Sequence, residues 1–289
     1  MKCIWREKMK RTMKIDVKEP QYIVNTNVTF AQPDAWFGHV TQDLKMDIIY
    51  AERTKEKRPC IVWICGGAWI QMSTSAHLLY LCELARQGFV VASVQYRTSN
   101  EAPFPAPLED VKSAIRYLKA HSERYGIDPE RFGVMGESAG GHLAAMTALT
   151  GKIKEFDKGL YLDYSSEVQA ACPWYLPADI SAGWEMDPLA RAASPESLLI
   201  GKNVALFPED AMKACPVSYV TPDAPPFLLL HGTNDHTVPY EQSEAMYKAL
   251  ESQGVDVDLI ALEGSDHADL PFFQKELWEI IFKFFKDKL

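Results

Sequence analysis

Long apolar runs are missing from this chain of 289 residues. Its most apolar stretches, residues 60–65 and 226–231, have the length of a strand. Both fall far short of the roughly 20 residues that a membrane-spanning helix needs. The basic cluster within residues 1–14 is not followed by the apolar segment of a secretory signal. We therefore expect no membrane span and no secretory signal, with residues 1–14 forming a frayed basic arm.

Positive charge is also scarce. The chain has 30 Lys and Arg against 39 Asp and Glu, which gives a formal net charge of −9. Nucleic acids and anionic membrane surfaces bind clustered basic side chains, so we expect neither of them as a partner.

Cysteine and histidine lack the spacings of metal sites. The six cysteines are scattered without a C-x-x-C pair, and the histidines show neither H-x-x-x-H nor H-E-x-x-H spacing. We therefore expect no catalytic metal, and we expect no cofactor. Several cysteines lie inside apolar runs, where a reduced thiol behaves as a small hydrophobe. This usage favours a cytoplasmic protein without disulfides.

What the chain does have is a regular alternation of short apolar runs and helical segments. Such alternation predicts an α/β fold with a mostly parallel, doubly wound sheet. Strands are expected at 60–65, 89–94, 131–135, 168–175, 227–232 and 255–262, and helices at 75–88, 108–125, 141–149, 241–254 and 271–289.

The beginning of the chain and one later segment depart from this alternation. The apolar–polar pattern of residues 44–50, with residues 21–24, predicts antiparallel strands at the N-terminal edge of the sheet, joined by a loop at 25–42. Residues 176–216 are rich in proline and are expected to form a small cap insertion. We therefore predict a single domain over residues 15–289.

The segment Gly136-Glu137-Ser138-Ala139-Gly140 joins an expected strand to an expected helix. A G-x-S-x-G sequence in that context is typical of a nucleophile elbow, in which the serine occupies a sharp, strained turn. The positive N-terminal end of the helix then points toward the serine and favours a developing negative charge. Ser138 is therefore the predicted nucleophile.

A serine hydroxyl needs a base, and that base needs an orienting carboxylate. Asp235 and His267 each follow one of the later strands, at the edge of the sheet where ligands bind. Asp266 is a rival for the acid, but adjacent side chains point apart, which favours Asp235. The order Ser138, Asp235, His267 is that of the α/β-hydrolase arrangement.

Three polar residues near these positions are expected to be structural. His231 ends a buried strand, and His142 lies one helical turn beyond Ser138, where packing is favoured over a place in the pocket. Glu137 is expected to bond a neighbouring loop. The sequence indicates no role for His77.

Several further motifs accompany this constellation. They are Cys65-Gly66-Gly67-Ala68-Trp69, Tyr96-Arg97, Phe104-Pro105-Ala106-Pro107 with Asp110, His231-Gly232 with Val238-Pro239, and Gly264. With them, residues 40–289 resemble the α/β-hydrolase superfamily, in the carboxylesterase branch near hormone-sensitive-lipase-like and acetyl- or feruloyl-esterase-like enzymes. The resemblance implies an α/β-hydrolase fold, and an oxyanion hole formed by the amides of Gly67, Ala68 and Ala139. The chain departs from the pattern at Cys65, where the family usually has a histidine that braces this loop.

The resemblance implies a serine carboxylesterase that forms an acyl-enzyme on Ser138. Its expected substrates are short-chain or aryl acyl esters, either small molecules or carbohydrate-linked, such as acetyl or feruloyl groups of plant polysaccharide. Trp69, Trp174 and Tyr175 are candidates for the substrate pocket. Trp184 and Phe207 of the insertion either shape that pocket or form the core of the cap. A homodimer is one expected assembly.

Two alternatives stay open. One is an arylformamidase of the kynurenine-formamidase type, which shares a similar glycine loop and triad. The other is a non-catalytic hydrolase-fold binding protein, which predicts a missing triad member.

Overall fold

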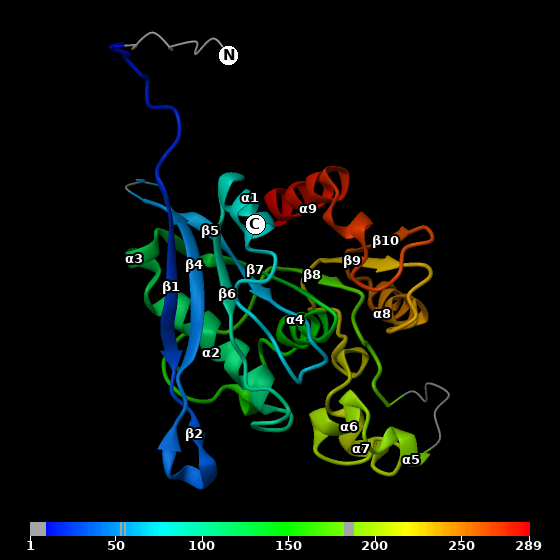
Figure 1. Cartoon of the computed structure of the whole chain (residues 1–289). Helices are drawn as coiled ribbons and strands as arrows, with labels where there is room; N and C mark the ends of the chain where they lie inside the picture. The colour runs from blue at the N-terminus through cyan, green and yellow to red at the C-terminus, as the bar shows by residue number, and fades with distance from the viewer. Residues whose placement is uncertain (1–9, 53, 55, 182–187) are drawn as a thin grey trace, which may run out of the picture.

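Eight strands form one sheet in the order β1-β4-β6-β5-β7-β8-β9-β10 (Figure 1). The computed structural model that shows this sheet describes residues 10–52, 54, 56–181 and 188–289. The strands are β1 (Tyr22–Ala31), β4 (Leu44–Ala51), β5 (Arg58–Ile64), β6 (Val90–Val94), β7 (Ile127–Glu137), β8 (Ala170–Trp174), β9 (Phe227–Gly232) and β10 (Val257–Leu262). The short strands β2 (Asp34–Ala35) and β3 (Val40–Thr41) form a separate hairpin.

Strand directions confirm the predicted sheet. β4 pairs antiparallel with β1 and with β6, whereas β6, β5, β7, β8, β9 and β10 pair in parallel. Parallel strands are joined by helices that cover both faces, so the central strands are buried on both sides. All residues of β6 and β8 are buried accordingly.

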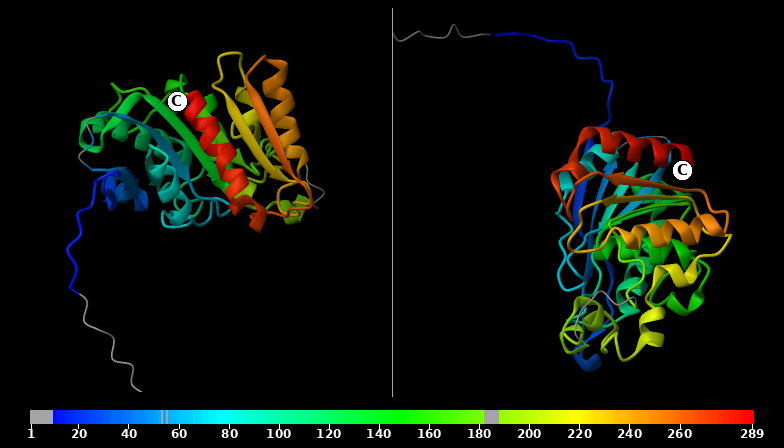
Figure 2. Two further views of the ribbon diagram at one scale, coloured as in Figure 1. Left: turned by 90° about the horizontal axis from the view of Figure 1, so that it is seen from above. Right: turned by 90° about the vertical axis from the view of Figure 1, so that its right-hand side faces the viewer.

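The helices cover the two faces of the sheet (Figure 2). α1 and α9 pack on one face, whereas α2, α4 and α8 pack on the other. The helices are α1 (Leu78–Arg86), α2 (Ala106–Ala120), α3 (Ser122–Tyr125), α4 (Ala139–Leu149), α5 (Pro188–Arg191), α6 (Pro195–Ile200), α7 (Pro208–Met212), α8 (Glu241–Ser252) and α9 (Lys275–Lys288). Single 3-10 turns occur at η1 (Trp36–Gly38), η2 (Lys154–Phe156), η3 (Pro216–Tyr219) and η4 (Leu270–Phe273).

Adjacent residues of a strand serve opposite layers of this core. In β5, Val62 packs with the α2 and α4 side, and Trp63 packs with the α1 and α9 side. This is the two-residue period of a strand, here apolar at every position. The continuous apolar runs of the sequence therefore mark strands with helices on both faces.

The first strand is longer than predicted. β1 continues to Ala31, although a loop was expected over residues 25–42. The register of β1 against β4 shifts between Asn25 and Val28, where Asn27 has a φ of 58° and donates its N–H to Asp47 Oδ1 at 2.8 Å. This bulge interrupts the apolar–polar alternation and conceals the strand in the sequence.

Two helix predictions also need correction. The helix expected over 108–125 is two helices, because the chain breaks at His121 between α2 and α3. The helix expected over 271–289 begins at Lys275, after the 3-10 turn η4.

The N-terminal segment and the insertion at residues 176–216 lie outside the central sheet. Residues 10–19 form no helix or strand and are largely exposed. Within 176–216 the helices α5, α6 and α7 lie at the lower edge of the molecule in Figure 1. Phe207 is exposed there and forms no cap core, and Trp184 lies outside the described residues.

Two absences concern the described part of the chain. None of its helices combines the length and the apolar composition that crossing a bilayer requires. In the same residues, no three His, Cys, Asp or Glu side chains are grouped so that they could hold a metal ion.

A buried charge cluster joins two cations of α2 to the carboxylate of Asp157. The side chains of Lys112 and Arg116 are fully buried, and both lie near Asp157 Oδ1, at 3.3 and 3.1 Å. Replacing Asp157 with asparagine would leave these two cations without their anion. We expect Asp157→Asn to lower the free energy of unfolding by about 3–5 kcal/mol in urea titrations.

The matched control is Asp223→Asn. Asp223 pairs with Lys152 at 3.0 Å on the surface, where both side chains are mostly exposed. Loss of an exposed pair changes stability little. Equal urea midpoints for the two variants would contradict the role given to the buried cluster.

Candidate active site

Ser138 occupies a strained turn between β7 and α4. Its φ of 52° and ψ of −121° lie in a region that side chains rarely adopt. The Ser138 N–H donates to the carbonyl of Trp174 at the end of β8, 3.0 Å away. Gly140 must be glycine, because a Cβ there would lie 2.0 Å from the carbonyl oxygen of Ile64. Close packing of the turn against neighbouring strands thus presents the hydroxyl at the edge of the sheet.

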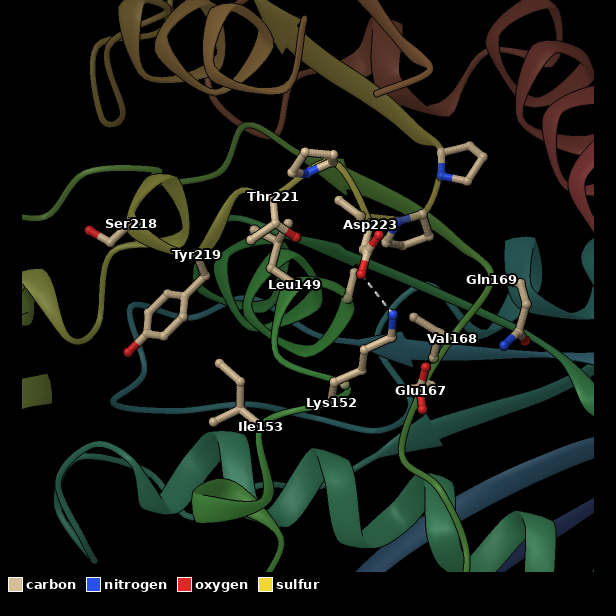
Figure 3. A pocket seen from close by; sticks show the side chains of 16 residues that line it. Leu149, Lys152, Ile153, Glu167, Val168, Gln169, Ser218, Tyr219, Thr221 and Asp223 are labelled. Atoms are coloured by element: carbon tan, nitrogen blue, oxygen red, sulfur yellow. Dashed lines mark hydrogen bonds and ion pairs between the residues drawn. The ribbon is translucent and has the colours of Figure 1, made fainter. Parts of the chain in front are cut away.

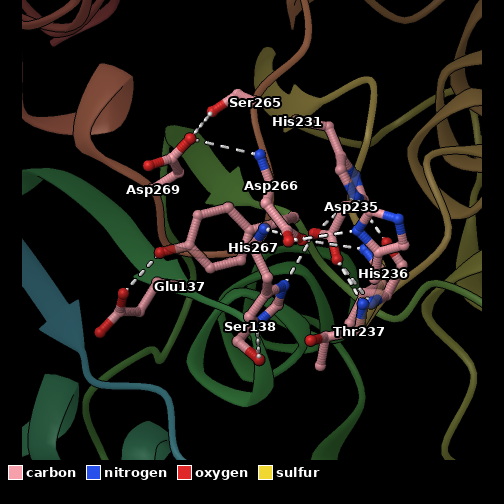
Figure 4. Close-up of polar contacts among 12 residues, drawn as sticks. Glu137, Ser138, His231, Asp235, His236, Thr237, Ser265, Asp266, His267 and Asp269 are labelled. Atoms are coloured by element: carbon pink, nitrogen blue, oxygen red, sulfur yellow. Dashed lines mark hydrogen bonds and ion pairs between the residues drawn. The ribbon is translucent and has the colours of Figure 1, made fainter.

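The structure brings Ser138, His267 and Asp235 into one chain of hydrogen bonds (Figure 4). His267 Nε2 lies 3.0 Å from Ser138 Oγ, and His267 Nδ1 lies 2.7 Å from Asp235 Oδ2. In the tautomer with its proton on Nδ1, the imidazole donates to Asp235 and accepts from the serine. This is the arrangement that a base needs in order to activate a hydroxyl.

Asp235 is held as an anion by its surroundings. Its side chain is fully buried, and Oδ1 accepts the N–H groups of Thr237 and Val238, each at 2.8 Å. Burial alone would raise the pKa of Asp235, but the hydrogen bonds from His231 and His267 outweigh it and hold that pKa well below its usual range. The carboxylate therefore stays ionised at neutral pH.

His231 is buried and hydrogen-bonded, as the sequence predicted. Its Nδ1 lies 2.7 Å from Ser243 Oγ, and its Nε2 lies 2.9 Å from the carbonyl oxygen of Val238. The sequence did not indicate that Nε2 also lies 3.2 Å from Asp235 Oδ2. The sequence signal for this contact was that His231 and Asp235 are only four residues apart, on either side of the end of β9.

Asp266 serves the backbone rather than the imidazole. Its Oδ1 accepts the N–H of His267 at 2.7 Å and the N–H of His236 at 3.0 Å. Its Oδ2 lies 3.2 Å from His236 Nδ1 on the exposed side of the loop. The geometry therefore assigns the imidazole of His267 to Asp235.

The loop after β5 has the backbone geometry of an anion cradle. Gly67, Ala68 and Trp69 have φ angles of 124°, 55° and 57°. A Cβ on Gly67 would lie 2.1 Å from the carbonyl oxygen of Gln71. Among the described residues, the N–H groups of Gly67, Ala68 and Ala139 take part in none of the turn, cap or loop hydrogen bonds. Uncommitted amides beside a nucleophile suit a developing oxyanion.

A cleft of about 510 Å³ opens over Ser138 and His267. Gly66, Gly67 and Ala68 form part of its wall, together with Tyr175, one of the three predicted pocket residues. Four other lining residues were not predicted from the sequence, although they lie on the loops that follow β5, β9 and β10. These are Ile70, Gln71, Thr237 and Ala268.

Trp69 and Trp174 do not line this cleft, so their prediction as pocket residues was wrong. Trp69 is 2% exposed, and its indole N–H donates to His142 Nδ1 at 3.2 Å. Trp174 is 0% exposed and packs edge-on against Trp63 and Trp278 on the α9 side of the sheet. Both rings are core because their strands and loops direct them inward. His142 has the structural place that was expected of it.

A larger hollow of about 760 Å³ lies elsewhere, beside Lys152 and Asp223 (Figure 3). Ser218 and Thr221 are the hydroxyl-bearing serine and threonine among its lining residues. None of its lining residues is a histidine, so neither residue has an imidazole base of the kind that His267 supplies to Ser138. Size alone therefore does not identify the reactive site, and the smaller cleft has the reactive groups.

Cys65 lies beside this cleft as a buried thiol. Its Sγ lies 3.8 Å from Glu137 Oε1, and its carbonyl oxygen accepts the hydroxyl of Tyr96 at 3.0 Å. Burial raises the pKa of Cys65 to about 11, although the N–H of Ser73 opposes the shift. At neutral pH the sulfur is therefore protonated and a poor nucleophile.

This state predicts resistance to alkylation. We expect iodoacetamide at pH 8 to leave turnover of p-nitrophenyl acetate unchanged, because the Cys65 thiolate is too rare to react. Mass spectrometry after unfolding in urea, where every thiol is accessible, is the control. Inactivation in step with alkylation of Cys65 in the folded protein would contradict the expectation.

Strand order, the strained serine turn and the Ser–His–Asp chain together define an α/β-hydrolase. This confirms the fold class predicted from the sequence. The chain belongs to the BD-FAE family, whose model matches residues 46–250.

Similar proteins agree with this membership. The chain is 34% identical over 224 residues to "Probable carboxylic ester hydrolase LipM" of Mycobacterium tuberculosis, covering 75% of this chain and 48% of that protein. The structure "Truncated form of carbohydrate esterase from gut microbiota" matches with a TM-score of 0.82 and 30% identity, over 94% of this chain and 99% of that chain. A propionate-bound esterase of Thermogutta terrifontis matches with a TM-score of 0.70 and 26% identity, over 85% and 90%. These comparisons confirm the carboxylesterase resemblance.

The chain spans about half the length of the curated relatives that it matches. Similarity to those relatives therefore concerns only the matched part of each.

Proposed function

We propose that this chain is a serine esterase that hydrolyses short-chain acyl esters through an acyl-enzyme on Ser138. The observation that carries the proposal is the hydrogen-bonded chain from Ser138 through His267 to buried Asp235, at 3.0 and 2.7 Å. The open cleft over the serine supports it, as do the similar proteins named as esterases.

The proposed reaction begins with removal of the Ser138 proton by His267 Nε2. Oγ attacks the carbonyl carbon of the ester, and the carbonyl oxygen becomes an oxyanion that the amides of Gly67, Ala68 and Ala139 stabilise. His267 then gives its proton to the departing alkoxide, which leaves as an alcohol. Water repeats the sequence on the acyl-enzyme and releases the acid. Asp235 stabilises the imidazolium that forms in each half of the reaction.

The proposed substrate is an ester with a small acyl group. A propionate-bound esterase and a carbohydrate esterase are among the similar structures, which supports short acyl groups and carbohydrate alcohols as candidates. We propose that the insertion at residues 176–216 acts as a cap that influences the choice of alcohol. We also propose that residues 15–289, with this insertion, form one hydrolase domain.

A panel of esters tests this function. It contains p-nitrophenyl acetate, butyrate and octanoate, methyl ferulate, acetylated xylan and N-formylkynurenine, each assayed with wild type and with Ser138→Ala. We expect the highest kcat/KM on acetate or butyrate. Turnover of the formamide alone would favour the arylformamidase alternative. No turnover and no labelling by a fluorophosphonate would favour the non-catalytic one.

Assembly and location extend the proposal. We propose a cytoplasmic location from the cysteine usage described above, and we propose a homodimer as the assembly. Size-exclusion chromatography with light scattering tests the dimer, and a monomer at micromolar concentration would overturn that part.

A further inference from the structure

A second buried carboxylate lies beside the triad. Glu137 immediately precedes Ser138, lines the cleft and is not part of the Ser–His–Asp chain. Its Oε2 accepts the hydroxyl of Tyr175 at 2.6 Å, and its Oε1 lies 2.9 Å from His77 Nε2. The backbone N–H of Gly66 also donates to this carboxylate. Glu137 is thus a buried carboxylate whose oxygens have hydrogen-bond partners, as buried polar groups require.

These donors keep Glu137 ionised. Burial by itself would raise the pKa of Glu137, but the hydrogen bonds from His77, Tyr175 and Gly66 more than offset it, and the pKa lies below the ordinary value. Hydrogen bonds to an ionised acceptor are among the strongest in proteins. Each donor is therefore held firmly in place.

Two of the donors lead directly to the reacting groups. The ring of Tyr175 packs edge-on against His267, with centroids 4.6 Å apart and planes at 62°. Gly66 begins the loop that carries the Gly67 and Ala68 amides. Through these two donors, the carboxylate of Glu137 contacts both Tyr175, which packs against His267, and Gly66, which begins the oxyanion loop.

His77 is another of the groups that bond Glu137, and its ring is itself held by packing. It precedes α1 with a φ of 60°, and its ring stacks on Phe273 with centroids 4.8 Å apart. The rings of His77 and Trp63 also meet edge-to-face, with centroids 5.8 Å apart. Ring packing fixes the direction of Nε2, so His77 holds Glu137 with little freedom of its own.

We propose that Glu137 is a positioning residue of the esterase and that His77 and Tyr175 hold it in position. The carboxylate fixes the Tyr175 ring against His267 on one side and the Gly66 end of the oxyanion loop on the other. This inference rests on the proposed function. It predicts that loss of a donor lowers kcat and the affinity for an oxyanion, while KM changes little.

The experiment compares two variants of His77. His77→Phe keeps a ring to stack on Phe273 but loses the donor, whereas His77→Gln keeps an N–H donor of similar reach. We expect His77→Phe to lower kcat for p-nitrophenyl acetate by about 10- to 100-fold, the range for hydrogen bonds to charged groups. His77→Gln should restore kcat to within about threefold of wild type, because the donor is retained.

A second readout separates positioning from general damage. Ser138 Oγ adds to the carbonyl carbon of a trifluoromethyl ketone, and the former carbonyl oxygen becomes an oxyanion. The inhibition constant of this ketone should therefore rise in His77→Phe by the same factor as kcat falls. Tyr175→Phe, which removes only the hydroxyl, should change kcat and this constant in the same direction and remains informative if His77→Phe fails to fold. The control is His121→Phe, at a histidine that stacks on Tyr117 and does not line the cleft.

Wild-type kcat and wild-type inhibitor affinity in both His77→Phe and Tyr175→Phe would overturn the inference. Inactive Ser138→Ala in the same assays would show that the esterase function stands regardless. Failure of the wild type to hydrolyse any ester would overturn the proposed function itself, and this inference with it.

Discussion

Replacing Ser138 with alanine should lower kcat for p-nitrophenyl acetate by about 10⁵- to 10⁶-fold. The variant loses the nucleophile, so no acyl-enzyme forms, and the amides of the cleft and substrate binding supply the only remaining catalysis. Initial rates, corrected for spontaneous hydrolysis, measure the loss. Labelling by a fluorophosphonate should disappear in parallel, because that reagent bonds to the same oxygen.

Ser218→Ala is the matched control for this experiment. Ser218 also lines a hollow, but one without a histidine among its lining residues. We expect its kcat to equal that of wild type within about twofold, as for substitutions away from the chemistry. If Ser138→Ala kept more than one hundredth of the wild-type rate, or if Ser218→Ala lost most of it, Ser138 would not be the nucleophile.

The second large effect is expected at Asp235. Asp235→Asn should lower kcat by about 10⁴-fold, because the neutral amide favours the wrong imidazole tautomer and does not stabilise the imidazolium. The fold should survive, since Asn Oδ1 still accepts the N–H groups of Thr237 and Val238. Kinetics at neutral pH, with circular dichroism to verify folding, give the result.

Asp266→Asn distinguishes the acid of the triad from its neighbour. Asp266 bonds the backbone N–H of His267 and lies on the exposed side of the loop. We expect less than about tenfold loss of kcat, because an exposed polar substitution changes the structure little. Reversed effects at the two positions would show that Asp266, not Asp235, orients the imidazole.

The sequence predicted those parts of the fold that depend on local pattern. Strands such as Phe227–Gly232 were predictable because a continuous apolar run of that length is stable only between two helical layers. β1 was only partly predictable, since the bulge at Asn27 depends on a side chain of another strand, Asp47. A register shift that a partner strand determines leaves no periodic pattern in the residues of β1 or of β4.

The same distinction holds at the site. Ser138, Asp235 and His267 were predictable because each follows an expected strand, and the ends of parallel strands meet at one edge. The direction of Trp174 was not, because one residue more or less along β8 turns a side chain from cleft to core. The contacts of His77 with Glu137 were also hidden, since they join residues 60 positions apart through packing alone.

Ser138 and His267 are separated by 129 positions, and β8, β9 and β10 must all pair before the two meet. Closing long loops costs entropy before the contacts that reward it form, so parallel pairing of distant strands is slow. β10 pairs only with β9 among the described strands and carries His267 at its end. We therefore expect catalytic competence to arise late in folding, and partly folded chains in which β10 is unpaired to be inert toward esters.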